Sequence, residues 1–281
     1  MKYILAHDLG TSGNKATLFS ESGALVASEV YSYGCHYFHE IWAEQDPEDW
    51  WRAICTTTRN LIAKAAIEPA QIAAVSFSGQ MMGCLCVDKA GHPLRPSIIW
   101  ADQRAQEQQQ AIAREISDWD FYRIAGHRNT ASYGIQKLMW VRDHEPEIYA
   151  KTDKFLTSTS YMVAKLTGKF VIDHYTAATW VPIYSMEKLG WEEDLSLFCR
   201  RDQLAECRWS DEIVGTVTPA AAEATGLAVG TPVTTGTADA SAEALSVGVL
   251  DPGDMMCMYG SSIFIIHVVE KLTTDKRLWA G

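Results

Sequence analysis

Strand-length runs of apolar residues open the chain, and short turns separate them. Residues 2–8 form the first run, Lys15–Ser20 the second, and Ala24–Tyr33 a third that is rich in β-forming residues. The turns between them, Gly-Thr-Ser-Gly and Glu-Ser-Gly, are too short to hold a crossover helix. The pattern therefore predicts a meander of β-hairpins at the start of the chain rather than a strand–helix–strand unit.

The first clear helical pattern follows this meander. Asp46 suits the N-cap position, Pro47 suits the first helical position, and two acidic residues follow where the helix dipole favours negative charge. This helix is predicted to continue to about Ala66. Further helices are predicted from Asp102 to about Glu115 and over 134–144, 158–166, 217–225 and Ala240–Val247, and further strands over Ala73–Ser78, Cys84–Asp88, Lys169–Asp173, Pro232–Thr235, 255–259 and 263–269.

Composition narrows the class of protein. The chain has 281 residues, 47% of them hydrophobic and 21% charged, which is typical of a globular protein with one large domain or two. A net charge of −11 and the absence of a basic run argue against nucleic acid as a partner. The first residues lack the pattern of a signal peptide, and the longest apolar stretch, 263–269, is too short to span a bilayer. We therefore expect a cytoplasmic protein with no membrane partner and with seven reduced cysteines.

The turn at Asp8–Lys15 lies between the first two predicted strands and carries chemistry that suits a phosphate. Small residues let backbone N–H groups approach an anion closely, the hydroxyls of Thr11 and Ser12 add donors, and Lys15 adds a cation. Asp8 is placed at a strand end to hold a magnesium ion, directly or through water. The turn matches neither the P-loop nor the dinucleotide-binding fingerprint. Taken alone, an ordinary hairpin turn explains these residues equally well.

Two later segments carry related chemistry. Asp239 lies after a predicted strand, at the start of a helix of small residues, where a carboxylate either caps the helix or accepts a proton from a hydroxyl. On its own, the cap is the simpler interpretation. Tyr259–Ser262, with the sequence Tyr-Gly-Ser-Ser between two strands, is a second candidate phosphate turn, although it too is compatible with a plain turn.

Together these three elements resemble the actin-like ATPase superfamily, in which two hairpin loops face each other across a cleft with a carboxylate between them. Within it, the chain resembles the FGGY carbohydrate kinases, and among them the xylulokinase-like proteins. The resemblance covers essentially the whole chain and rests on Asp-Leu-Gly-Thr-Ser-Gly at 8–13, Trp-Ala-Glu-Gln-Asp-Pro at 42–47, Gly-Gln-Met at 79–81, Ile-Trp-Ala-Asp at 99–102, His-Glu-Pro-Glu at 144–147, the segment 225–233 and Asp239.

The resemblance implies an α/β fold of the ribonuclease H-like actin-ATPase type, with a mixed central sheet and flanking helices. It also implies that residues 1–233 form the N-terminal, sugar-binding lobe and that residues 234–281 begin a truncated C-terminal, nucleotide-binding lobe. Family members complete the nucleotide site, including the adenosine-binding segment, with the rest of that lobe. We therefore expect no adenine pocket here and expect the 281 residues alone to transfer phosphate poorly or not at all.

The implied reaction is ATP-dependent phosphorylation of a sugar, with ATP and Mg²⁺ as cofactors and a small sugar as partner. Asp239 corresponds to the catalytic base that takes the proton from the attacking hydroxyl. Asp8 corresponds to the acidic residue beside magnesium and the transferring phosphate. A homodimer is compatible with the sequence, which does not determine the oligomeric state. The resemblance assigns the ATP phosphates to Gly10, Thr11, Ser12 and Lys15 in the first turn and to Gly260, Ser261 and Ser262 in the second.

On the sugar side, the resemblance implies contacts from Gln80, Met81, Met82, Trp100 and Asp239. Met82 stands where xylulokinases have a histidine. A thioether is a weak acceptor and not a donor, so this difference changes which hydroxyls the site can recognise. D-Xylulose is the leading substrate, while ribulose, erythrulose and xylitol remain open, as does an inactive sugar-binding fragment without an adenine site.

Other polar and aromatic residues have less definite roles. Trp100 either lines the sugar pocket or belongs to the core, and Trp42 either shapes that pocket or packs. Asp102 and Arg104 are candidates for a place near the sugar, and a position away from it is the alternative. His144 suits the C-terminal end of a helix, and for Asp173 we expect a structural role.

Overall fold

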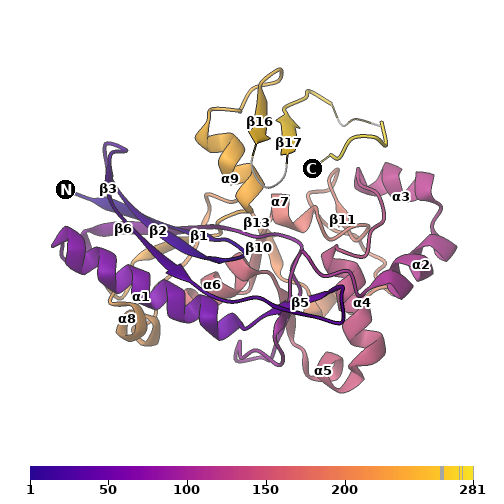
Figure 1. Cartoon of the computed structure of the whole chain (residues 1–281), viewed down its shortest axis with the longest axis horizontal. Helices are drawn as coiled ribbons and strands as arrows, with labels where there is room; N and C mark the ends of the chain where they lie inside the picture. The colour runs from indigo at the N-terminus through magenta and orange to yellow at the C-terminus, as the bar shows by residue number, and fades with distance from the viewer. Residues whose placement is uncertain (260–262, 272, 274, 281) are drawn as a thin grey trace.

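The computed structural model describes residues 1–259, 263–271, 273 and 275–280. Its centre is a mixed six-stranded sheet in the order β14-β15-β6-β1-β2-β3, seen edge-on in Figure 1. The first three strands form the predicted antiparallel meander, and β6 pairs with β1 in parallel. The strands of this sheet are β1 (Tyr3–Leu9), β2 (Gly13–Ser20), β3 (Leu25–Ser32), β6 (Ile72–Gly79), β14 (Ile213–Thr216) and β15 (Pro232–Thr234).

Helix α1 (Pro47–Ala65) carries the chain back to start the parallel strand β6. As predicted, Asp46 is the N-cap and its side chain accepts a hydrogen bond from the N–H of Glu48. Buried side chains such as Trp50 and Ile54 face the sheet. Figure 1 shows α1 and α8 (Pro219–Thr225) below the sheet, with α6 (Ser158–Thr167) near its centre. The opposite face of β3 remains open to solvent, since its residues are at most half-buried.

A second group of helices lies beyond the ends of β1 and β6 (Figure 1). The predicted helix at 102–115 begins only at Gln106. The Asp102 carboxylate binds Arg104 and the N–H of Ala43, and these bonds hold the residues just before Gln106 in a turn. The predicted helix 134–144 is confirmed. The helices here are α2 (Gln106–Glu115), α3 (Asp118–Ala125), α4 (Gly134–His144), α5 (Pro146–Lys151) and α7 (His174–Ala177).

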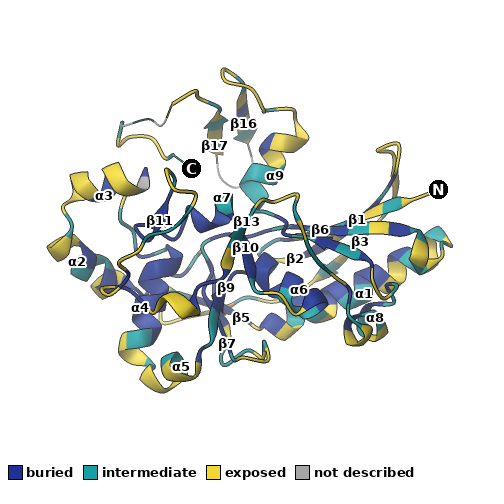
Figure 2. Ribbon diagram, turned by 180° about the vertical axis from the view of Figure 1, so that it is seen from behind, coloured by how far each residue is buried: buried dark blue, intermediate teal, exposed yellow. Residues whose placement is uncertain are grey.

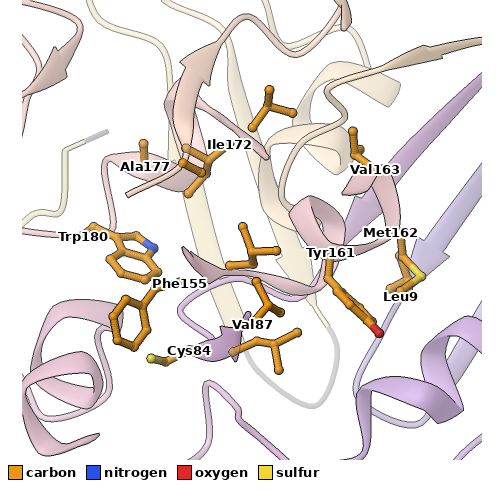
Figure 3. Packing of buried hydrophobic residues seen from close by; sticks show 14 of the residues in the cluster. Leu9, Cys84, Val87, Phe155, Tyr161, Met162, Val163, Ile172, Ala177 and Trp180 are labelled. Carbon is orange, nitrogen blue, oxygen red and sulfur yellow. The ribbon is translucent and has the colours of Figure 1, made fainter. Parts of the chain in front are cut away.

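Buried apolar residues join the sheet to this helical region. Figure 2 shows α4 and α6 as largely buried, whereas α2 and α3 are mostly exposed. The core between the sheet and this helical region contains Phe155, Tyr161 and Trp180. Figure 3 shows Phe155 and Trp180 on one side of the cluster and Tyr161 on the other. The remaining strands of this region are short: β4 (His36–Phe38), β5 (Trp42–Gln45), β7 (Leu85–Val87), β8 (Ser97–Ile98), β9 (Lys154–Leu156), β10 (Val171–Asp173), β11 (Tyr184–Ser185), β12 (Gly190–Trp191) and β13 (Glu206–Arg208).

The last part of the chain contains helix α9 (Asp239–Ser246) and a hairpin of β16 (Met255–Tyr259) and β17 (Ile263–His267), which stands apart from the main sheet (Figure 1). Residues 275–280 then return to the helical region. There the Trp279 indole N–H donates to His127 at 3.0 Å, and the Ala280 N–H donates to the Gly126 carbonyl at 2.9 Å. Within the described ranges, each helix is too short or too polar to cross a membrane.

Candidate active site

The carboxylates of Asp8 and Asp239 lie where the carboxyl ends of β1 and β6 approach the start of α9, and the charge of Asp8 contributes to the raised pKa of Asp239. Asp8 lies near the end of β1, opposite Lys15 on β2 and Ser78 on β6, and its Oδ1 accepts a hydrogen bond from the Ser78 hydroxyl at 3.0 Å. The N–H of Thr237 donates to the carbonyl of Phe77 at 2.9 Å, which fixes the entry to α9 against the end of β6. The structure thus brings together residues that lie more than two hundred positions apart in the sequence.

Asp239 occupies the first turn of α9 and is half-buried. The N-cap position belongs to Ala238, so the interpretation of Asp239 as the helix cap is wrong. Its Oδ1 accepts the N–H of Ala240 at 2.8 Å, which orients the carboxylate. The pKa of Asp239 is raised to about 6, chiefly by burial, and the charges of Glu243 and Asp8 contribute to the rise. A carboxylate of this pKa is largely ionised at neutral pH and is still basic enough to accept a proton.

The carbonyl groups of the turn after β1 accept hydrogen bonds from within the turn and from Tyr33. The Gly10 N–H donates to the Gly13 carbonyl at 3.0 Å and closes the turn. The Tyr33 hydroxyl donates to the Gly10 carbonyl at 2.7 Å, and its N–H donates to the Ser12 carbonyl at 3.1 Å. By contrast, the N–H groups of Thr11 and Ser12 have no partner among the residues that the structure describes. These two N–H groups are therefore available as donors, and their binding to an anion stays a prediction.

Gly13 must be glycine for this turn to form. A Cβ at this position would lie 2.7 Å from the carbonyl oxygen of Tyr31 on β3. The close approach lets β2 and β3 pair up to the edge of the turn, since Gly13 and Ser32 are partners in the sheet. Lys15 follows two residues later and is exposed on the strand opposite Asp8, so the two side chains lie on the same face of the sheet.

Gln45, which sequence reasoning used only as part of a motif, links the phosphate turn to the predicted sugar loop. Its Nε2 donates to the carbonyl of Thr11 at 2.6 Å. Its Oε1 accepts from the indole of Trp50 at 3.1 Å and from the Gln80 amide at 2.6 Å. Both glutamines are buried. A glutamine in a strand-like segment gives no sign of these partners, because they come from parts of the chain that are remote in sequence.

Replacing Gln45 with leucine is expected to lower the free energy of unfolding by roughly 1–3 kcal/mol, because the substitution leaves several buried polar groups without a hydrogen-bond partner. Chemical denaturation of the two proteins measures the change. Gln110→Leu is the matched control, since Gln110 is exposed on α2 and its loss should change stability by less than about 0.5 kcal/mol. Equal destabilisation by the two substitutions would contradict the bridging role of Gln45.

The predicted sugar-side residues follow the end of β6. The side-chain amide of Gln80 donates to Gln45, and its backbone carbonyl accepts from the Ser158 hydroxyl at 3.1 Å. These buried contacts hold the loop after β6 in place. Met81 is buried, whereas Met82 is half-buried and has a φ of 61°, in the left-handed region. The loop is therefore held in one strained conformation by its surroundings.

Trp100 lies beside the phosphate turn. Its side chain is exposed, with 46% of the residue accessible, and its indole N–H donates to the Thr11 hydroxyl at 2.8 Å. The alternative that Trp100 is a core residue is therefore wrong. An exposed aromatic face beside the phosphate turn is a suitable wall for a small polar ligand, and its contact with substrate stays a prediction.

Asp102 and Arg104, two candidates for a place near the sugar, form hydrogen bonds within the protein, and their distance from the sugar stays a prediction. Asp102 is fully buried, and its Oδ2 accepts from the Ala43 N–H at 2.6 Å and from Arg104 at 2.7 Å. The Arg104 guanidinium lies 3.9 Å from the ring centre of Trp42 and 4.9 Å from that of Trp140. Trp42 therefore packs, which was one of its two predicted roles, and this cluster joins β5 to the segment before α2.

Asp173 has the structural role that the sequence suggested, and the structure shows what it holds. It caps α7, where its Oδ2 accepts the N–H of Thr176 at 3.0 Å, and the same oxygen accepts the Thr237 hydroxyl at 2.9 Å. Because Thr237 lies two residues before Asp239, Asp173 positions the start of α9. His144 ends α4 and stacks on Trp140, as expected of a structural residue.

Tyr175 is a neighbour of the carboxylate that sequence reasoning missed. Burial raises its pKa to about 12, and the charges of Asp239 and Asp173 contribute to the rise. The predicted second phosphate turn, Gly260–Ser262, lies outside the described residues; the strands β16 and β17 that flank it are present as predicted. Within the described part of the chain, there is no cluster of three or more metal-ligating side chains.

A mixed sheet with a glycine-containing hairpin turn and a helix-borne carboxylate at its carboxyl edge characterises carbohydrate kinases of the ribonuclease H-like, actin-ATPase fold. Residues 3–246 match the N-terminal domain of the FGGY family of carbohydrate kinases, and the chain belongs to this family. The predicted family and fold are thus confirmed.

Individual relatives agree with this assignment. The chain is 32% identical to a xylulose kinase of Escherichia coli (strain K12), over 94% of this chain and 54% of that protein. It is 29% identical to a gluconokinase of Bacillus subtilis (strain 168), over 98% of this chain and 53% of that protein. The crystal structure of xylulose kinase from Rhodospirillum rubrum matches with a TM-score of 0.93 and 26% identity, over 99% of this chain and 57% of that one. The chain spans about half the length of the curated relatives it matches.

Proposed function

We propose that the protein is an ATP-dependent kinase that transfers the γ-phosphoryl group of ATP to a hydroxyl of a sugar, with D-xylulose as the leading substrate. One observation carries the proposal: the carboxylate of Asp239, with its raised pKa, lies close enough to Asp8 to feel its charge, at the strand end that bears the turn of unpaired N–H groups. The resemblance to xylulose kinases over nearly the whole chain supports the same conclusion.

In this mechanism, Asp239 accepts the proton of the attacking hydroxyl as the bond to the γ-phosphorus forms. The N–H groups of Thr11 and Ser12, the hydroxyls of both residues and the ammonium group of Lys15 hold phosphate oxygens of ATP. Gly10 allows these donors to approach the phosphates closely. On the basis of the resemblance, Gly260, Ser261 and Ser262 hold phosphate oxygens from the other side.

Asp8 fits a magnesium ion in its chemistry and placement. Mg²⁺ prefers hard oxygen ligands and is usually bound by one or two carboxylates together with substrate phosphates and water. Asp8 offers such a carboxylate at the edge of the phosphate turn and is exposed to solvent. A bound magnesium ion would neutralise charge on the phosphates, while the hydrogen bond from the Ser78 hydroxyl restricts the orientation of the Asp8 carboxylate.

The sugar would lie against Met81, Met82 and Trp100, with Gln80 supporting the loop from behind. The relatives include both a xylulose kinase and a gluconokinase, so the family does not select one sugar. Ribulose, erythrulose and xylitol are the alternatives, because Met82 provides no strong hydrogen-bonding group. We also propose that 1–233 form the sugar-binding lobe, and that 234–281 belong to the nucleotide-binding lobe.

The test is a panel of D-xylulose, ribulose, erythrulose, xylitol and gluconate, assayed with the full-length protein by coupled detection of ADP. We expect ATP-dependent turnover with a sugar of this panel, and the highest kcat/KM with D-xylulose. Calorimetric titration with ATP and magnesium tests the alternative of a sugar-binding protein without kinase activity. Sugar binding without any nucleotide binding or ADP formation would overturn the kinase assignment.

The pH dependence follows from the pKa of Asp239. Because the base must be ionised, kcat/KM should fall roughly tenfold for each pH unit below about 6 and should level off above it. Removing the neighbouring charge with Glu243→Gln should move this inflection to lower pH, since the Glu243 carboxylate raises the pKa of Asp239. A profile that is flat between pH 5 and 7 in the wild-type protein would contradict the assignment of this base.

A further inference from the structure

A fully buried lysine on α4 has no part in the proposed chemistry, yet it contacts the loops that form the sugar side of the site. We propose that Lys137 is a positioning residue that fixes Met82 and Trp100 in the arrangement that receives the sugar. This inference rests on the proposed function and adds a residue that determines sugar affinity without touching the sugar.

The contacts of Lys137 are unusual for a lysine. Its Nζ donates to the carbonyl of Met82 at 2.9 Å, to that of Ile99 at 2.7 Å and to that of Ser132 at 2.5 Å. These carbonyl groups come from three separate segments: the loop after β6, the segment that leads into Trp100, and the turn before α4. In its protonated form the side chain has three N–H donors, one for each of the three segments.

Two of the Lys137 contacts, to the carbonyl groups of Met82 and Ile99, stabilise the backbone on the sugar side of the site. Met82 has a left-handed backbone with a φ of 61°, which costs a non-glycine residue on the order of 1–2 kcal/mol. Lys137 binds the carbonyl of this strained residue. Ile99 directly precedes Trp100, whose indole reaches the Thr11 hydroxyl of the phosphate turn. By binding both segments at once, Lys137 sets the distance between the Met82 loop and the Trp100 wall.

A role in general stability is a weaker explanation for this residue. Burial lowers the pKa of Lys137 to about 7, and the charge of Asp102 opposes this effect while that of Arg104 adds to it. Lys137 forms no ion pair with any residue that the structure describes. A buried cation without such a pair is costly. The three carbonyl groups around its Nζ offset part of this cost and come from three separate segments of the chain.

The test is Lys137→Met, which keeps an unbranched side chain that is one atom shorter and removes all three donors. Hydrogen–deuterium exchange on the protein should show faster exchange in 79–83, 97–102 and 130–134 than in the wild type, with β1 and α6 unchanged. Calorimetry with D-xylulose should show at least a tenfold rise in Kd, while the Kd for ATP with magnesium stays within twofold. Lys64→Met is the matched control, because Lys64 is exposed on α1 and also donates to a carbonyl group.

The exchange measurement and the calorimetry together distinguish a failure of this inference from a failure of the proposed function. If the wild-type protein binds no sugar of the panel but Lys137→Met speeds exchange in the three segments selectively, the proposed function is wrong and the positioning role stands. Uniformly faster exchange, or unchanged exchange in the three segments, would overturn the positioning role. If Lys137→Met does not fold, Lys137→Gln retains two donors, and the same selective pattern is expected from it with a smaller rise in Kd.

Discussion

Replacing Asp239 with asparagine is expected to reduce kcat for sugar phosphorylation by about 10²–10⁴-fold, the range typical of a lost general base. The amide keeps the shape of the carboxylate and its hydrogen bond to the Ala240 N–H, so α9 should retain its position. Sugar binding should therefore change by only a few-fold. Coupled detection of ADP gives kcat, and calorimetry with the sugar gives Kd.

Glu243→Gln is the matched control for this experiment. Glu243 lies on the same helix, one turn further along, is exposed and contributes its negative charge to the surroundings of Asp239. Its substitution should leave kcat at neutral pH within about twofold, because the base is already ionised there. If the two variants lose activity equally, the effect belongs to the local charge and Asp239 is not the base.

Replacing Gly236 with alanine is expected to reduce activity by about 10²-fold or more, since small displacements of catalytic groups have effects of this size. Gly236 has a φ of +73°, and a Cβ would lie 2.5 Å from the carbonyl oxygen of Phe77. That carbonyl accepts the Thr237 N–H, so the substitution pushes the start of α9 away from β6 and takes Asp239 with it.

Gly230→Ala separates the clash from the backbone effect. Gly230 has a φ of +86°, but a Cβ added there would have no atom within 4 Å. Gly230→Ala should therefore destabilise the protein only through the left-handed backbone of the alanine, by about 1–2 kcal/mol. Thermal unfolding and kcat should be measured for both variants. We predict a larger loss of stability and activity for Gly236→Ala. Similar behaviour of the two variants would show that the contact with Phe77 does not position the base.

The parts of the fold that were predictable from sequence are those with local causes. The turns of the first three strands contain residues with strong turn preferences, and α1 has its N-cap in Asp46 and its proline at the first position, so both were predicted closely. The two-residue and three-residue strands have no period long enough to detect. The late start of α2 depends on Asp102, whose partner Ala43 is 59 positions away.

In the candidate site, too, local features were predictable from sequence and contacts with remote segments were not. The turn and the carboxylate are visible as residue types, but their proximity came from the resemblance to a family and not from any local pattern. Gln45, Lys137 and Tyr175 were missed because their importance lies in partners from remote segments. Asp102 and Arg104 were candidates for a place near the sugar, and the structure shows that they form an ion pair inside the protein. Residue type alone does not distinguish these two uses.

The central claim is that Asp239 and the turn after β1 together transfer phosphate from ATP to a sugar. Phosphorus NMR of the full-length protein with ATP, magnesium and D-xylulose tests it most directly, in parallel with the Asp239→Asn variant. We predict a growing sugar-phosphate signal that matches the loss of ATP in the wild type and is absent in the variant over the same period. ATP loss without a sugar-phosphate signal, or an equal signal from the variant, would contradict it.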